Sequence, residues 1–102
     1  MSLVRGGPIV LIGAGNMGGA MALGWIKSGI PGSSIIAADP SPPEAIKAKF
    51  DGSGVQFVAE APHGVIASVI FVAVKPQVME LVLPAYSKLI GPETIVVSIA
   101  AG

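Results

Sequence analysis

Three glycines near the N-terminus, Gly13, Gly15 and Gly18, have a spacing that can bind a phosphate group. In such a motif the first glycine allows a sharp turn and the second lets the backbone approach a pyrophosphate. The third lets a helix pack closely on its strand. The phosphate would lie at the N-terminus of that helix, where unpaired N–H groups and the helix dipole favour an anion without a basic side chain. This fits the sequence, because no Lys or Arg occurs between Arg5 and Lys27.

The residues around the glycines support this interpretation. A run of strand-forming residues, 9–12, precedes Gly13, and a second strand-like run ends at Asp39, about 21 residues after Gly18. An acidic residue at that place can accept hydrogen bonds from an adenosine ribose, and its charge favours a free 2′-hydroxyl over a 2′-phosphate. Two alternatives remain: Asp39 is only a turn residue before Pro40, or the glycine turn serves packing alone.

Two other residues could do chemistry. Lys75 is the only charged residue between Glu60 and Glu80, and a catalytic role is conceivable. We favour a strand-end residue whose backbone shapes the loop under a cofactor, since position is the only evidence for catalysis. His63 has no second histidine and no cysteine to share a metal, so we expect a surface loop there. The sequence therefore predicts no catalytic and no metal-binding residue.

The composition limits the class of protein. The chain has 102 residues, of which 52% are hydrophobic and 12% charged, which indicates one domain, 1–102, with strands buried on both faces of a sheet. No run of about 18 apolar residues lacks Gly, Pro or a charge, so we expect no membrane span. Zero net charge gives no footprint for nucleic acid. The absence of cysteine and of a signal-peptide pattern predicts a cytoplasmic protein.

Strand and helix patterns alternate along the chain. We expect strands at 8–12, 34–39, 55–58, 69–74 and 94–99 and helices at 16–28, 41–50 and 76–90. The second helix should begin with a capping box from Ser41 to Glu44, and Pro84 should kink or break the third. This order predicts an α/β fold of the doubly wound, Rossmann type, with a mainly parallel sheet in the order 3-2-1-4-5.

Helical spacing also predicts which faces pack on the sheet. On the first helix these are Met17, Ala20, Met21 and Trp25, with Gly24 allowing close approach to the sheet. On the third helix they are Val78, Leu81, Val82, Ala85 and Leu89. The ligand should bind outside the carboxyl ends of the strands, where the strand order reverses between the first and the fourth.

Three segments closely resemble the N-terminal domain of pyrroline-5-carboxylate reductases: IGAGNMGGAM at 12–21, FVAVKPQVM at 71–79 and SIAAG at 98–102. The resemblance covers nearly the whole chain, and AVKPQ followed by IAAG is narrower than the glycine motif. It implies NADP or NAD as cofactor. The implied cofactor contacts, with Asp39 added from the glycine fingerprint, are Ile12, Gly13, Ala14, Gly15, Asn16, Met17, Asp39, Ala73, Val74, Lys75, Pro76, Ile99, Ala100 and Ala101.

In that family the reaction is hydride transfer from NAD(P)H to 1-pyrroline-5-carboxylate, giving L-proline. Substrate binding and homo-oligomer formation belong to a helical C-terminal domain, which this sequence lacks, so we expect a fragment that binds only the cofactor. One departure from the family is AEAPHG at 59–64, where an asparagine that contacts adenosine is common. The alternatives are another β-hydroxyacid or F420-type NADP oxidoreductase domain, or a non-enzymatic nucleotide-binding module.

Overall fold

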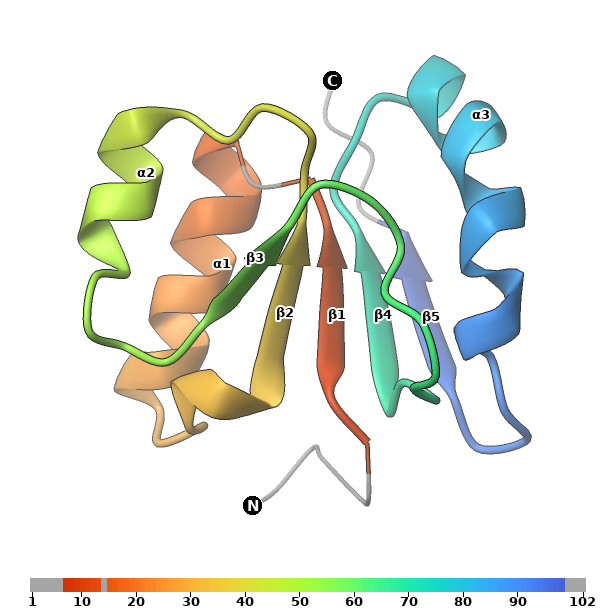
Figure 1. The fold of residues 1–102 in the computed structure, drawn as a ribbon, viewed down its shortest axis with the longest axis horizontal. Helices are drawn as coiled ribbons and strands as arrows, with labels where there is room; N and C mark the ends of the chain where they lie inside the picture. The colour runs from red at the N-terminus through yellow and green to blue at the C-terminus, as the bar shows by residue number, and fades with distance from the viewer. Residues whose placement is uncertain (1–6, 14, 99–102) are drawn as a thin grey trace.

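Five short strands form one parallel sheet in the order β3-β2-β1-β4-β5 (Figure 1). The computed structural model describes residues 7–13 and 15–98. The predicted strand order and the Rossmann-type doubly wound arrangement are confirmed. The strands are β1 Ile9–Ile12, β2 Ile35–Ala38, β3 Gln56–Val58, β4 Val69–Val72 and β5 Ile95–Ser98.

The central strands are apolar because both of their faces are covered. All four residues of β1 and all four of β2 are buried. Alternate residues enter different cores: Val10 and Ile12 pack in one cluster, and Leu11 packs in the other. A sheet buried in this way accounts for the high hydrophobic content of so short a chain.

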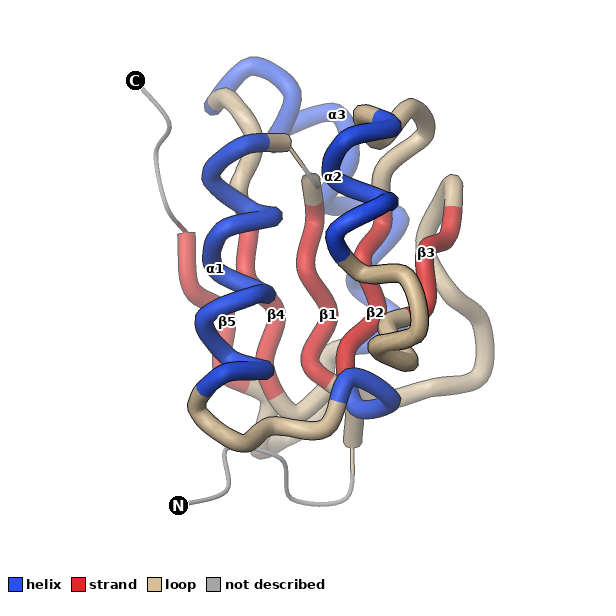
Figure 2. Tube along the Cα trace, turned by 90° about the vertical axis from the view of Figure 1, so that its left-hand side faces the viewer, coloured by secondary structure: helices blue, strands red, loops and turns tan. Residues whose placement is uncertain are grey.

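The helices lie on both sides of the sheet, with α1 and α2 on one face and α3 on the other (Figure 2). Their bounds are α1 Asn16–Lys27, α2 Glu44–Lys49 and α3 Pro76–Tyr86, with short 3₁₀ turns at Gly32–Ser34 and Ser87–Leu89. Ala22 of α1 and both Ile46 and Phe50 at α2 pack with Leu11. The connection 59–68 between β3 and β4 contains no helix, and its Ala61 and Val65 pack on the α3 side of the sheet.

The predicted capping box of the second helix is wrong. The helix begins at Glu44, its N-cap is Pro43, and no side chain caps it. The backbone N–H of Ser41 donates instead to Oδ1 of Asp39 at 2.8 Å, which forms a tight turn directly after β2. Pro42 and Pro43 explain why the helix begins later than predicted, because the helical conformation is disfavoured for a residue that precedes proline.

The predicted inner face of the first helix is only partly correct. Trp25 does face the sheet and packs on Phe71, with ring centroids 4.7 Å apart. Met17 is 42% exposed and Ala20 is also exposed. A side chain at Gly24 would meet nothing within 4 Å, so the expected close approach there is wrong. The inner side runs instead through two glycines, because Gly18 lies against the β1 turn and a Cβ at Gly19 would be 3.0 Å from Ile46 Cγ2.

The predicted inner face of the third helix is about one residue out of register. Val78 and Ala85 are exposed, and Leu81 is 81% exposed, although Val82 and Leu89 do pack inward. Met79, Leu83 and Tyr86 take the remaining inner positions. The helix does not break at Pro84, since it continues to Tyr86 and then tightens into a 3₁₀ turn, and the other expectation, a kink at Pro84, stays a prediction. The packing against the sheet, rather than hydrophobicity alone, sets the rotation of this helix.

Within 7–13 and 15–98, none of the helices is both long enough and apolar enough to cross a membrane.

Two leucine substitutions test this assignment of inside and outside. Leu11 is fully buried between helices and sheet, so Leu11→Ala should lower the free energy of unfolding by about 2–5 kcal/mol. Leu81→Ala removes the same atoms from a side chain that solvent already reaches, and should change the free energy of unfolding by less than about 0.5 kcal/mol. Urea unfolding of the two variants and the wild type measures both values. Similar losses in the two variants would contradict the orientation of α3.

Candidate functional site

The turn after β1 requires glycine at its first position. Gly13 has φ +96°, a conformation that side chains disfavour. A Cβ at Gly13 would lie 2.7 Å from the carbonyl oxygen of Ala73 and 2.8 Å from Val74 Cγ1. The N–H of Gly13 donates to the carbonyl of Ala38 at 2.9 Å, and that of Ala73 donates to the carbonyl of Ile12 at 2.9 Å. The turn is therefore held between the ends of β2 and β4.

The third glycine of the motif brings α1 onto this turn. A Cβ at Gly18 would collide with the carbonyl oxygen of Gly13, and Leu11 Cδ2 would be 3.5 Å away. Only a residue without a side chain lets the helix backbone approach so closely. The structural roles predicted for Gly13 and Gly18 are confirmed.

The second glycine leaves space at the start of α1. Gly15 is the N-cap of this helix, and no side chain forms a capping hydrogen bond with it. Among the residues that the structure describes, none has an atom within 4 Å of a Cβ built at Gly15, and the first turn of α1 has no acidic residue. The first N–H groups of a helix have no partner within it and carry the positive end of its dipole. This open, uncapped terminus can accept an anionic group such as phosphate.

Asp39 leaves the sheet beside the glycine turn. Its N–H donates to the carbonyl of Val58 at 2.9 Å, so it follows β2 while still bonded to the last residue of β3. The side chain is half-buried, and Oδ1 accepts the N–H of Ser41. The interpretation as a turn residue is therefore correct as far as it goes, and a contact with ribose stays a prediction.

The segment after β4 lies on the other side of the turn. Ala73 and Val74 adjoin Gly13, and Lys75 is the N-cap of α3. The carbonyl of Lys75 accepts the N–H groups of Val78 at 2.9 Å and Met79 at 3.0 Å, while its side chain is exposed. Lys75 thus shapes the loop and the helix start, as the favoured interpretation expects.

The remaining predicted contacts divide into two groups. Asn16 begins α1, Met17 follows it and Pro76 begins α3, so the structure brings all three to the same edge of the sheet as Gly13. Four predicted contacts lie outside the described residues: Ala14, Ile99, Ala100 and Ala101. Binding of a cofactor by any of these residues stays a prediction.

Tyr86, the last residue of α3, is a buried titratable residue that the sequence did not indicate. It projects inward from α3 and is only 5% exposed. Burial raises the pKa of its hydroxyl first of all, and the carboxylates of Asp39 and Glu60 raise it further. The signal that could have found it is the seven-residue spacing from Met79 to Tyr86, which repeats the true inner face of α3.

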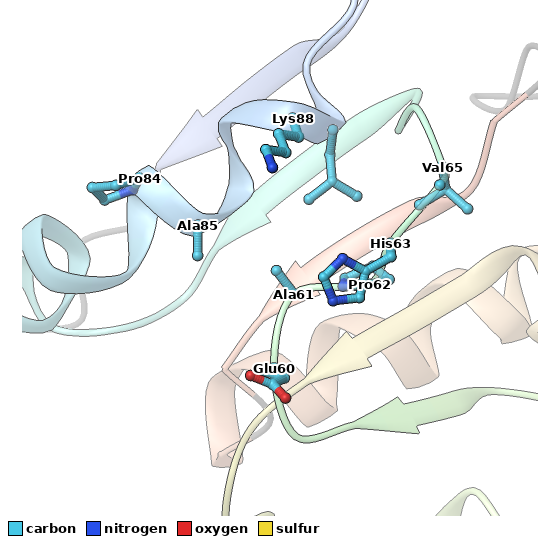
Figure 3. Close-up of a pocket in the computed structure, with 10 residues that line it drawn as sticks. Glu60, Ala61, Pro62, His63, Val65, Pro84, Ala85 and Lys88 are labelled. Atoms are coloured by element: carbon cyan, nitrogen blue, oxygen red, sulfur yellow. The ribbon is translucent and has the colours of Figure 1, made fainter.

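A shallow hollow of about 290 Å³ lies between the connection 59–65 and the C-terminal part of α3 (Figure 3). Glu60, His63 and Lys88 are among the polar residues that line it. His63 is exposed in its loop, as predicted. Within the described ranges no three His, Cys, Asp or Glu side chains come together in a way that could hold a metal ion.

Comparison with known proteins adds a family and several relatives. The family model described as "NADP oxidoreductase coenzyme F420-dependent" matches residues 8–102. Proteins named pyrroline-5-carboxylate reductase are similar: that of Escherichia coli is 43% identical over 98 residues and that of Pseudomonas aeruginosa 38% over 96. Pyrroline-5-carboxylate reductase 3 of Danio rerio is 41% identical over 97 residues. These alignments cover 92% of this chain but 35%, 34% and 33% of those proteins, so the chain spans about a third of their length.

One solved structure is similar in fold. The chain resembles SirC, a precorrin-2 dehydrogenase, with a TM-score of 0.68 over all of this chain and 50% of that one. The identity is 14%, so this likeness concerns the fold alone.

The raised pKa of Tyr86 predicts a specific loss of stability in alkali. A group that holds its proton more tightly when folded stabilises the protein fully below its unfolded pKa of about 10, and this contribution falls as the pH rises from there through the folded value. Between pH 8 and pH 11, the wild type should therefore lose more unfolding free energy than Tyr86→Phe does. Urea unfolding of both proteins at the two pH values measures this, and every other effect of pH is common to the two proteins. Equal losses would contradict the prediction.

Proposed function

Since this chain belongs to the family of NADP oxidoreductases described as coenzyme F420-dependent, we propose that it is the dinucleotide-binding part of a pyrroline-5-carboxylate reductase. The observation that carries the proposal is the contact of Gly13 with Ala73 and Val74, because it joins two of the motifs by which the chain resembles these reductases. The whole protein would transfer hydride from NADPH or NADH to the C=N carbon of 1-pyrroline-5-carboxylate, which gives L-proline. The bound dinucleotide supplies that hydride.

The residues of the site fit such a cofactor. The open space at Gly15 and the uncapped start of α1 support binding of the pyrophosphate there. The segment Ala73 to Pro76 adjoins the same turn and would line the path toward the nicotinamide. In this proposal the chain holds and orients the cofactor. We assign proton transfer to none of its described residues.

Asp39 would contact the adenosine ribose. It follows β2, and its Oδ1 is oriented by the Ser41 N–H. The resemblance to pyrroline-5-carboxylate reductases is the only support for four further cofactor contacts, which are Ala14, Ile99, Ala100 and Ala101. We also propose a cytoplasmic location, and homo-oligomers that form only together with a C-terminal domain.

The family description favours a second candidate, an F420-type NADP oxidoreductase domain. Such a protein would share the dinucleotide site and differ in its second substrate. Reduction of 1-pyrroline-5-carboxylate separates the two candidates, and failure to bind any dinucleotide would remove both.

Gly15→Val tests the site itself. Because the side chain would enter space that is open in the structure, the variant should fold like the wild type and lose dinucleotide affinity by at least about 100-fold. Gly24→Val is the matched control, since a Cβ there also meets nothing within 4 Å and lies further along α1. Calorimetric titration with NADH and NADPH measures affinity, and circular dichroism checks the fold. Unchanged affinity in a folded Gly15→Val protein would place the ligand elsewhere.

A hybrid protein tests the reaction. The 102-residue chain alone should bind NADH or NADPH but show no oxidation of it dependent on 1-pyrroline-5-carboxylate. Fused to the part of the Escherichia coli relative beyond its matching third, it should show that oxidation. Gly15→Val in the hybrid is the control, because it should abolish activity without changing the fused part. Activity of the short chain by itself would contradict the expected division of the site.

A further inference from the structure

Met17 places an oxidisable sulfur beside the open start of α1. It is the second residue of that helix, two positions after the N-cap Gly15, and its side chain is 42% exposed. The Cα–Cβ bonds of a helix tilt toward its N-terminus, so this side chain leans toward the helix start. Within the described residues, Met17 included, no atom lies within 4 Å of a Cβ built at Gly15. The thioether therefore lies next to the open space without filling it.

Met17 is also the most exposed methionine in the part of the chain that the structure describes. The sequence has no cysteine, the residue that peroxides usually oxidise first. Met21 and Met79 are only partly exposed. Met79 also packs against the core on the α3 side of the sheet, and its Sδ accepts a hydrogen bond from Ser98 at 3.8 Å. Because oxidation follows the exposure of the sulfur, Met17 should react before both.

We propose that Met17 is a redox-sensitive site, and that its oxidation to the sulfoxide by hydrogen peroxide weakens dinucleotide binding. The sulfur lone pair attacks one peroxide oxygen and the O–O bond breaks. The sulfur is thereby oxidised by two electrons and the peroxide is reduced. The departing hydroxide takes the proton of the transferred oxygen and leaves as water. The inference rests on the proposed function and adds a regulation of the same site.

The sulfoxide oxygen competes with phosphate for the same hydrogen-bond donors. A thioether is a weak acceptor, whereas a sulfoxide is polar and its oxygen carries partial negative charge. The first N–H groups of α1 have no partner within the helix, and no side chain caps its N-terminus. The helix dipole attracts negative charge to this end. The oxidised Met17 side chain thus accepts hydrogen bonds that the pyrophosphate needs.

Treatment of the folded 102-residue chain with dilute hydrogen peroxide tests the proposal. Tandem mass spectrometry assigns each added oxygen to one methionine, and calorimetric titration with NADH and NADPH measures affinity before and after treatment. We expect Met17 to be oxidised first and both dissociation constants to rise about tenfold, the effect of about one hydrogen bond lost from the pyrophosphate. Methionine sulfoxide reductases A and B, one for each epimer, should restore the affinity.

Two substitutions in α1 form a matched pair. Met17→Leu removes the sulfur, so the affinity of this variant, whatever its starting value, should change by less than about twofold on treatment. Met21→Leu keeps Met17 and should lose affinity on treatment as the wild type does. Circular dichroism before and after treatment checks that each protein stays folded.

The outcomes separate the two proposals. A loss of affinity that is confined to proteins with Met17 and reversed by the reductases supports the inference. It is overturned, with dinucleotide binding intact, if Met21 or Met79 is oxidised before Met17, if affinity is unchanged once Met17 carries the oxygen, or if Met17→Leu loses as much affinity as the wild type. If the folded, untreated wild type binds neither dinucleotide, the proposed function fails and the inference fails with it.

Discussion

The geometry of the site depends on one steric constraint, the approach of the α1 backbone at Gly18 to the carbonyl oxygen of Gly13. Any side chain at Gly18 would push the helix away from the turn. Gly13 is constrained a second time, because Ala73 and Val74 occupy the space that its own side chain would need. The contact therefore links β1, α1 and the end of β4, and it directs the open N-terminus of α1 toward the edge where these elements meet.

The parallel sheet builds the rest of the site around this contact. Because β1 lies between β2 and β4, the residues that follow those two strands emerge on either side of the glycine turn. The N–H of Gly13 donates to the carbonyl of Ala38, and the N–H of Ala73 donates to the carbonyl of Ile12. These hydrogen bonds fix where β2 and β4 end relative to the glycine turn. Asp39 and Lys75, 36 residues apart, thus reach the same edge of the sheet. In the proposed function, backbone groups would bind the phosphate and one carboxylate would bind the ribose.

The third helix shows how packing alters what a hydrophobic pattern suggests. The helix α3 has apolar residues on more than one side. Val78, Leu81 and Ala85 are spaced so that they share one face, and Met79, Leu83 and Tyr86 are spaced so that they share another. Contact with the α3-side core selects the second set. It buries the only tyrosine in the field of Asp39 and Glu60, and it leaves Leu81 in solvent.

The sequence by itself determined the order of the elements, the strand order and the place of the glycine turn. These follow from runs of β-branched residues, from the spacing of the glycines, and from the right-handed crossover that parallel strands adopt. Only the tertiary structure decided the rotation of α1 and α3 and the burial of Tyr86. Those features depend on contacts between residues far apart in the chain, and side-chain spacing within one helix cannot tell which of two apolar faces the sheet will cover.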